Sequence, residues 1–193
     1  WSIVPWIDGT PVDHAPLDAE QGSALAAFLH ALHRPAPADA PANPGRGVRL
    51  ETRREGFAPC LDRLRTSCDL ITPAIDAAWR GALAASLCDA PVWLHGDLHA
   101  QNVLSLEGRL AGVIDWGDMS GGDPAVDLCS VWGVLAHPHA RAEALRIYAP
   151  DDALLARARG WAILFGASLF DNGRIDDPRH AAIGEATLRR LDA

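Results

Sequence analysis

The stretches HGDLHAQN, residues 95–102, and GVIDWGD, residues 112–118, hold the most informative residues of this 193-residue chain. Asp97, Asn102 and Asp115 each stand at the edge of a short apolar segment. A rigid scaffold holds polar groups beside a cleft in this way. Two carboxylates and an amide supply hard oxygen ligands, and these suit Mg²⁺, which completes its shell with phosphates and water.

A second use is open to Asp97, because it has no Lys or Arg among its close sequence neighbours. Such a carboxylate can accept a proton from a substrate hydroxyl, or simply orient it. Phosphoryl transfer needs this division of labour, because a metal neutralises the phosphates while a carboxylate positions the incoming oxygen in line. The residue types in the two stretches are therefore compatible with phosphoryl transfer.

The pattern His-x-Asp-x-x-x-x-Asn at residues 95–102, followed by Ile-Asp-x-Gly at residues 114–117, resembles the catalytic and metal-binding loops of protein kinase-like enzymes. Together with GDPAVDL at residues 122–128, these motifs are similar to those of the aminoglycoside phosphotransferase family in particular. The resemblance covers nearly the whole chain. SIVPWIDG at residues 2–9 resembles the family's hinge, and RGWA at residues 159–162 resembles part of its C-terminal end.

The resemblance implies a role for each matching residue. Asp97 would be the catalytic base, and Asn102 and Asp115 would be the Mg²⁺ ligands. His95 would brace the loop rather than react. Asp127 would hydrogen-bond that loop from the following helix.

The nucleotide-binding positions are implied in the same way. The backbone of Pro5 to Ile7 would hydrogen-bond adenine, and Leu104 and Ile114 would pack against its ring. The implied cofactors are Mg²⁺ and ATP or GTP. Ala-Gln at residues 100–101 replaces the Pro-containing pair common in these loops, a change that concerns the shape of the loop and not its ligands.

The family also has an N-terminal lobe with a glycine-rich phosphate loop and a Lys that pairs with the α- and β-phosphates. This chain contains no Lys, and its 17 basic residues are all Arg. We therefore expect a hinge segment at residues 1–9 and a kinase-like C-terminal lobe at residues 10–193. The expected partners are a cationic small-molecule hydroxyl acceptor and the N-terminal lobe, which lies outside the chain. Residues 1–193 alone are then expected to be inactive.

Hydrophobic periodicity predicts a predominantly helical α+β domain with one small β-hairpin insertion. Glu107 and Gly108 separate the apolar runs of the hairpin, and Asp18 with Gln21 predicts a capping box for the first helix. The remaining expected elements are an extended segment at 1–7 and helices at 18–33, 57–68, from 73, from 124, 141–148, 152–170 and 178–191.

Composition narrows the class of protein. An apolar fraction of 49% and a mean hydropathy of +0.01 are typical of one globular domain with a real core. No run approaches about 18 consecutive apolar residues, so we expect no membrane span. The net charge of −8 disfavours nucleic acid and anionic membranes and is compatible with cationic small molecules. No Cys-x-x-Cys pair occurs, so free thiols in a reducing cytoplasm are expected at Cys60, Cys68, Cys88 and Cys129.

The resulting prediction is a cytoplasmic phosphotransferase that moves the γ-phosphate of a nucleotide to a hydroxyl of a small molecule. An aminoglycoside-like antibiotic is the favoured acceptor, with a macrolide, a sugar or an amino alcohol behind it. Several C-terminal carboxylates either bind substrate amines or form a solvated helix face. These are Asp171, Asp176, Asp177 and Glu185.

Two alternatives stay open. The first is a metal-dependent hydrolase whose transition metal is bound by His95, Asp97 and His99. This alternative gives no role to Asn102 and Asp115. The other alternative is a non-catalytic binding module that kept the kinase-like shape. The presence of the base and both metal ligands argues against it.

Overall fold

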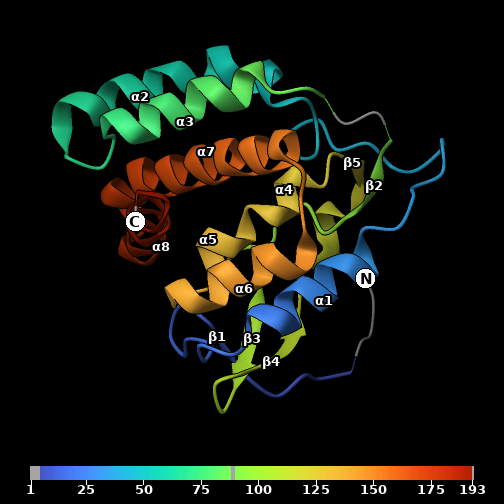
Figure 1. The fold of residues 1–193 in the computed structure, drawn as a ribbon. Coiled ribbons are helices and arrows are strands. Elements are labelled where there is room, and N and C mark those ends of the chain that lie inside the picture. Colours follow the sequence, from blue (N-terminus) through green and yellow to red (C-terminus); the bar gives the residue numbers. More distant parts are fainter. Residues whose placement is uncertain (1–4, 88–89, 193) are drawn as a thin grey trace.

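The computed structural model describes residues 5–87 and 90–192 of the chain. The long helix α7 (Asp152–Asp176) crosses the middle of the molecule (Figure 1). Helices α2 (Arg54–Ser67) and α3 (Pro73–Ala84) pack along one side of it, and α8 (Pro178–Leu191) packs against its C-terminal half. The mainly helical α+β domain predicted from the sequence is confirmed.

Helix α7 is central because small and large apolar residues alternate around it. Trp161 and Ile163 are fully buried, and Gly166 meets Gly184 where α7 and α8 approach closely. A Cβ added at Gly184 would lie 2.4 Å from the carbonyl oxygen of Gly166, so only glycine permits this spacing. By length and composition, with a mean hydropathy of 1.3, α7 could also cross a membrane, but half of its apolar window is buried inside the protein, as in a core helix.

A second group of helices lies on the other side of α7. Helix α1 (Gly22–Leu32) packs against α6 (Pro138–Tyr148). The short helices α4 (Ala125–Leu128) and α5 (Ser130–Val134) lie between this pair and α7 and α8. The sequence predicted one helix from residue 124, whereas the structure breaks it at Cys129.

The predicted hairpin is confirmed. Strand β3 (Val103–Leu106) pairs antiparallel with β4 (Arg109–Val113), and β1 (Thr10–Pro11) adds to the other edge of β3. Glu107 and Gly108 have φ angles of 51° and 77°, and positive angles at both positions match the twist of a two-residue hairpin loop.

A second sheet, of two strands, was not predicted from the sequence. β2 (Val92–Leu94) pairs antiparallel with β5 (Ser120–Gly122). The sequence Ser-Gly-Gly has no strand propensity, so its pairing depends on the partner strand. This ribbon matters for the site, because it brings the loop at residues 95–102 beside the turn at residues 115–118.

Several element boundaries differ from the prediction. Residues 5–7 form no strand, since the edge strand lies at Thr10–Pro11, and residues 1–4 lie outside the described part. The predicted capping box is wrong, because Gln21 instead accepts a hydrogen bond from the backbone N–H of Leu110 and α1 begins only at Gly22. A 3₁₀ turn, η1 (Leu50–Arg53), precedes α2, so that helix begins earlier than predicted.

Other local predictions are confirmed. Thr72 caps α3, with Pro73 at its first position, and Asp177 caps α8 by accepting from the N–H groups of Arg179 and His180. Free thiols are found at Cys60, Cys68 and Cys129, whereas Cys88 lies outside the described residues.

Candidate active site

The 95–102 loop leaves the end of β2 and is held from below by Asp127 of α4. The Asp127 side chain is fully buried, and its two oxygens accept from the backbone N–H groups of His95 and Gly96 at 2.7 and 2.9 Å. Gly96 has a φ of 84°, and a Cβ there would lie 2.6 Å from the carbonyl oxygen of Asp118. The loop is therefore pinned to α4 on one side and pressed against the 115–118 turn on the other.

His95 ties the loop to the end of β4. Its buried ring accepts the Asp97 N–H at Nδ1 (3.2 Å), and its Nε2 lies 2.9 Å from the carbonyl oxygen of Ile114. Since a carbonyl can only accept, Nε2 carries the hydrogen and donates it. Both ring nitrogens are thus used inside the protein, which agrees with the bracing contact expected of His95.

These contacts overturn the metal-dependent hydrolase alternative. The His95 ring has no nitrogen left for a metal, although Asp97 and His99 lie 3.4 Å apart. Within residues 5–87 and 90–192, no group of three His, Cys, Asp or Glu side chains surrounds a metal position.

Asn102 and Asp115 offer oxygen atoms with no protein partner among the described residues. Asn102 donates from Nδ2 to the Asp97 carbonyl oxygen (2.9 Å), and its own backbone oxygen accepts from the N–H of Ile114, also at 2.9 Å. This leaves its side-chain oxygen free and sets Asp115 one residue beyond a direct backbone contact. The exposed Asp115 has φ 61°, a left-handed conformation that Asp tolerates. One amide oxygen and one carboxylate fit the few hard ligands that Mg²⁺ takes from a protein.

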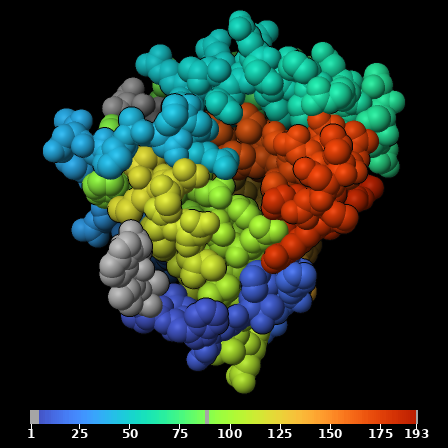
Figure 2. All heavy atoms as spheres, turned by 180° about the vertical axis from the view of Figure 1, so that it is seen from behind, coloured from blue at the N-terminus to red at the C-terminus, as the bar shows by residue number. Residues whose placement is uncertain are grey.

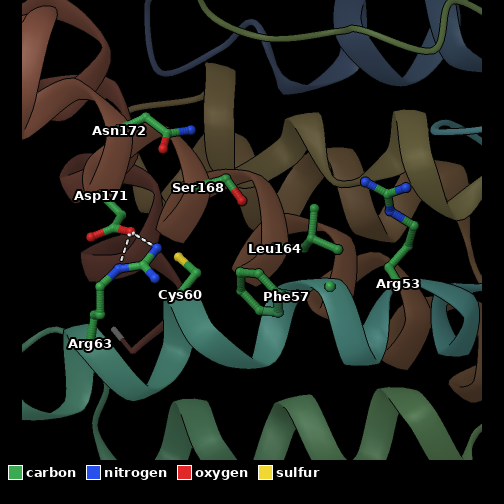
Figure 3. Close-up of a pocket in the computed structure, with 9 residues that line it drawn as sticks. Arg53, Phe57, Cys60, Arg63, Leu164, Ser168, Asp171 and Asn172 are labelled. Carbon is green, nitrogen blue, oxygen red and sulfur yellow. Dashed lines mark hydrogen bonds and ion pairs between the residues drawn. The ribbon is translucent and has the colours of Figure 1, made fainter.

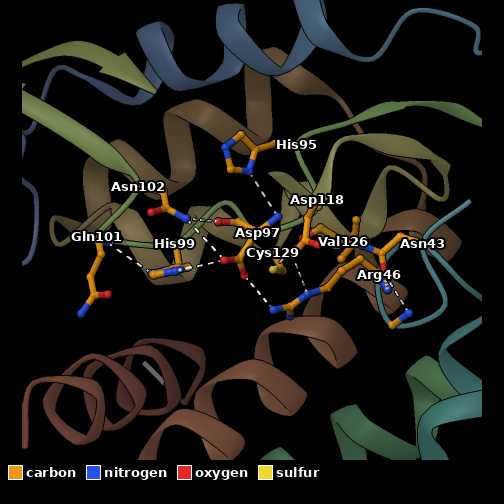
Figure 4. A network of polar contacts seen from close by, with 12 residues as sticks. Asn43, Arg46, His95, Asp97, His99, Gln101, Asn102, Asp118, Val126 and Cys129 are labelled. Carbon is orange, nitrogen blue, oxygen red and sulfur yellow. Dashed lines mark hydrogen bonds and ion pairs between the residues drawn. The ribbon is translucent and has the colours of Figure 1, made fainter. Parts of the chain in front are cut away.

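Asp97 lies at the centre of the polar network in Figure 4. Oδ1 accepts from Nη2 of Arg46 at 2.8 Å, and Oδ2 lies 3.4 Å from both Nδ2 of Asn102 and Nε2 of His99. Partial burial raises the pKa of Asp97, but the hydrogen bond from His99 and the charge of Arg46 outweigh burial and hold the pKa below its usual value. The carboxylate is therefore ionised at neutral pH and acts as an acceptor only.

Sequence reasoning missed Arg46 and Asn43. Asn43 accepts from the N–H groups of Gly45 and Arg46 and donates from Nδ2 to Asp118 at 2.9 Å. The guanidinium of Arg46 stacks on the ring of Phe165, 4.5 Å from its centroid. The Asn-Pro-Gly sequence does signal a turn. Nothing local signals that this turn delivers a cation to a carboxylate 51 positions away.

A cavity of about 440 Å³ opens beside Asp97. On the face shown in Figure 2, the loop before η1, the 95–102 segment and the C-terminal helices meet around this region. Its lining combines Asp97 with apolar and polar side chains, namely Arg46, Leu98, His99, Phe165, Ser168, Leu169, Asn172 and His180.

A smaller cavity of about 210 Å³ lies on the side of α2 (Figure 3). Ser168 and Asn172 of α7 line both cavities, so the two adjoin at these side chains. The far side is formed by α2 and η1, where Arg53 and Arg63 line the wall.

The carboxylates expected to bind amines are largely engaged within the protein. Asp171 lines the smaller cavity but accepts from Arg63 and Arg174, each at 3.0 Å. Asp177 caps α8 and also lies 3.0 Å from His180. The remaining two are exposed or partly exposed, with Glu185 paired to Arg189 and Asp176 on the surface.

Three of the four positions expected at the nucleotide gather on the β3–β4 ribbon. A Cβ at Gly112 would lie 2.8 Å from Ile7, and Leu104 pairs with Gly112 across the ribbon. Ile7 and Ile114 are each 37% exposed, whereas Leu104 is only 6% exposed. Pro5, the fourth position, is exposed.

Comparison with known proteins identifies the family of the chain. A family model described as "Phosphotransferase enzyme family" matches residues 1–162. The chain belongs to this family, and the resemblance seen in its sequence is confirmed. No curated protein sequence matches the chain.

Solved structures show the same fold. The chain is 26% identical to the macrolide 2'-phosphotransferase MphH from Brachybacterium faecium, with a TM-score of 0.53 over 94% of this chain and 68% of that one. It is 17% identical to the AMP-bound spectinomycin phosphotransferase APH(9)-Ia, with a TM-score of 0.60 over 98% of this chain and 71% of that one. The chain is 14% identical to the protein in the GDP and kanamycin complex of APH(2")-IIia, with a TM-score of 0.59 over 97% of this chain and 69% of that one.

Proposed function

We propose that the protein transfers the γ-phosphate of ATP or GTP to a hydroxyl group of a small molecule, with Asp97 as the base. One observation carries the proposal. The ionised Asp97 lines an open cavity on one side, and on the other it contacts Asn102, whose backbone is bonded to the residue before Asp115. An acceptor site and a metal-ligand pair thus meet at a single carboxylate.

The chain's own residues account for the acceptor half of the reaction. A hydroxyl in the cavity donates to the Asp97 carboxylate, which turns the hydroxyl oxygen toward the incoming phosphoryl group. The lowered pKa makes Asp97 a weak base, so the proton moves to it late, as the new bond to phosphorus forms. Mg²⁺, held by Asn102 and Asp115, would neutralise charge on the nucleotide's phosphates.

The apolar surface around the β3–β4 hairpin supports a nucleotide site at this hairpin. Five of the eight exposed large apolar side chains of the described residues lie in two short segments: Trp6 and Ile7, and Ile114, Trp116 and Met119. Such patches on a monomer mark a ligand or partner site. We assign this surface to the nucleotide base and to a lobe that carries the phosphate loop and the Lys, so residues 1–193 alone should not turn over ATP.

The cavity favours an acceptor with few charges. Phe165, Leu98 and Leu169 give it apolar walls, and Arg46 places a guanidinium in it. An aminoglycoside carries several ammonium groups, and the Asp97 carboxylate in the lining is already paired with Arg46. A macrolide has a large apolar ring and fewer charges. Two neighbours that are 26% identical are macrolide 2'-phosphotransferases, so we place a macrolide ahead of an aminoglycoside as acceptor.

The test is a coupled phosphotransferase assay of the intact protein with ATP and with GTP, against a panel of macrolides, aminoglycosides and simple amino sugars. We expect nucleotide consumption that depends on acceptor and on Mg²⁺, with a phosphorylated product detected by mass spectrometry. Acceptor binding without turnover under every condition would instead indicate the non-catalytic binding module.

A further inference from the structure

Arg46 is a charged side chain of the site that comes from neither of the two stretches found in the sequence. It stands on the loop before η1 and contacts both of them. Nη2 lies 2.8 Å from Oδ1 of Asp97 in the 95–102 loop, and Nε lies 3.8 Å from Oδ2 of Asp118 in the 115–118 turn. A single guanidinium therefore spans the loop of the base and the turn that carries Asp115.

This guanidinium is held in place independently of the two carboxylates. Its plane stacks on Phe165 of α7, and its backbone is fixed by the turn around Asn43. Asn43 also donates to Asp118, so the turn and the arginine grip the same carboxylate. An arginine is suited to this task, because its planar fork can hold two carboxylates at once while stacking on a ring.

The contacts around Asp97 leave one direction open. An ionised carboxylate has about four lone-pair positions, two on each oxygen. Asn102 and His99 approach Oδ2, and Arg46 takes one position on Oδ1. Oδ1 keeps one position for a further donor, and Asp97 and Arg46 both line the cavity.

We propose that Arg46 is a positioning residue of the phosphoryl transfer: it locks Asp97 so that only Oδ1 can receive the acceptor hydroxyl, and it fixes the 95–102 loop relative to the 115–118 turn. The proposal rests on the proposed function. In the step it serves, the acceptor O–H gives its proton to Asp97 Oδ1 and its oxygen bonds to the γ-phosphorus. The bond from the γ-phosphorus to the bridging oxygen breaks and releases a nucleoside diphosphate.

The experiment compares Arg46→Ala and Arg46→Lys with the parent in the intact protein. Because a misplacement of about 1 Å can cost roughly 100-fold in rate, we expect kcat of Arg46→Ala to fall by about that factor. KM for the nucleotide should stay within about threefold, because the arginine acts on the base and not on nucleotide affinity. Arg46→Lys should fall between the two, since an ammonium restores one charge contact but not the fork.

Arg49→Ala is the matched control, because Arg49 stands on the same loop, is exposed and has no side-chain partner among the described residues. Added guanidinium ion should restore part of the kcat of Arg46→Ala and none of that of the control, a response that a purely structural role would not give. A kcat of Arg46→Ala equal to that of Arg49→Ala would overturn the proposal.

If Arg46→Ala does not fold, Arg46→Lys decides: a parent-like kcat overturns the proposal, and a kcat at least about fivefold lower, with an unchanged melting temperature, supports it. A parent protein that transfers phosphate to no acceptor would sink the proposed function itself, whereas an active parent with unaffected Arg46 variants sinks only the role of Arg46.

Discussion

Asp127 organises more of the site than any other single side chain. Its two oxygens accept from successive backbone N–H groups at His95 and Gly96, and Nε2 of His33 lies 3.5 Å away. A fully buried carboxylate is stable only when such partners replace water. The orientation of the 95–102 loop is therefore set by an acceptor that cannot move.

Replacing this acceptor should damage both stability and rate. Asp127→Asn turns one acceptor oxygen into an N–H₂ group that faces a backbone N–H. Two buried donors are then unpaired, and each unpaired donor costs about 1–3 kcal/mol of stability. We expect a lower melting temperature and a kcat reduced by about 100-fold through loop displacement. Chemical denaturation and steady-state kinetics measure the two effects. The same substitution at exposed Asp176 serves as control, and parent-like values at position 127 would contradict the assigned contact.

Asp97→Asn addresses the base itself. The amide keeps the shape of the side chain but cannot take the proton of the acceptor hydroxyl. Turnover should be lost, while nucleotide binding, measured by calorimetry, should remain nearly intact because Asn102 and Asp115 are unchanged. Near-parent turnover of this variant would remove Asp97 from the role of base.

Asp115→Asn tests the metal-ligand assignment with little change in shape. Asn tolerates the left-handed backbone that Asp115 adopts, so the turn should survive the substitution. Loss of the negative charge should weaken Mg²⁺ binding, and the Mg²⁺ concentration needed for half-maximal rate should rise. A titration that overlays that of the parent would contradict the assignment. Glu51→Gln, at an exposed position on η1, provides the control for removal of one negative charge.

At the scale of elements, Asp123 joins two helices that are far apart in sequence. Its carboxylate accepts from Nε of Arg157 on α7 at 2.7 Å and from the backbone N–H of Ala125 at the start of α4. One carboxylate therefore contacts both the start of α4 and the N-terminal half of the long helix α7. Both members of the ion pair are buried, with side chains 6% and 9% exposed, and Arg157 also donates to the carbonyl oxygen of Ser86.

Breaking this buried pair should destabilise the whole domain. Asp123→Ala leaves the guanidinium of Arg157 without its counter-charge inside the protein, a change that costs about 3–5 kcal/mol. Urea denaturation should show the loss as a lower midpoint with an unchanged slope. The surface pair of Glu185 and Arg189 offers the comparison, because its removal should cost less than about 1 kcal/mol. Equal effects at the two sites would mean that the buried pair adds nothing.

The elements also show why part of the site was predictable and part was not. The 95–102 and 112–118 stretches could be found because their functional residues have a fixed local spacing, and the hairpin because Glu107-Gly108 is a local turn signal. The side chain of Arg46 and the strand β5 depend on partners distant in sequence, so no local pattern predicts them. The turn at Asn43 has a local signal, but its contact with Asp118 does not. The ion pair between Asp171 and Arg63 could not be predicted for the same reason.

At the scale of the whole molecule, two carboxylates fasten outlying segments to the C-terminal helices. Asp13, in the turn after β1, pairs with Arg179 of α8, and Asp171 of α7 pairs with Arg63 of α2. Burial raises the pKa of each carboxyl, but the hydrogen bonds and charges of the arginines outweigh it, so both pKa values lie below the ordinary value. Each group therefore binds its proton less readily in the folded protein than in the unfolded chain.

The sign of the pH effect follows directly. A carboxyl with a lowered folded pKa stabilises the fold above its unfolded pKa of about 3.9, and this contribution is lost as the pH falls from about 5 through the lower folded value. Melting temperatures measured from pH 7 down to pH 2.5 should therefore fall once the pH drops below about 5. Asp13→Asn should melt below the parent at pH 7, and the gap should close at the acid end, where the parent's Asp13 is also neutral. A gap that stayed constant with pH would show that the Asp13–Arg179 contact stabilises through shape and not through charge.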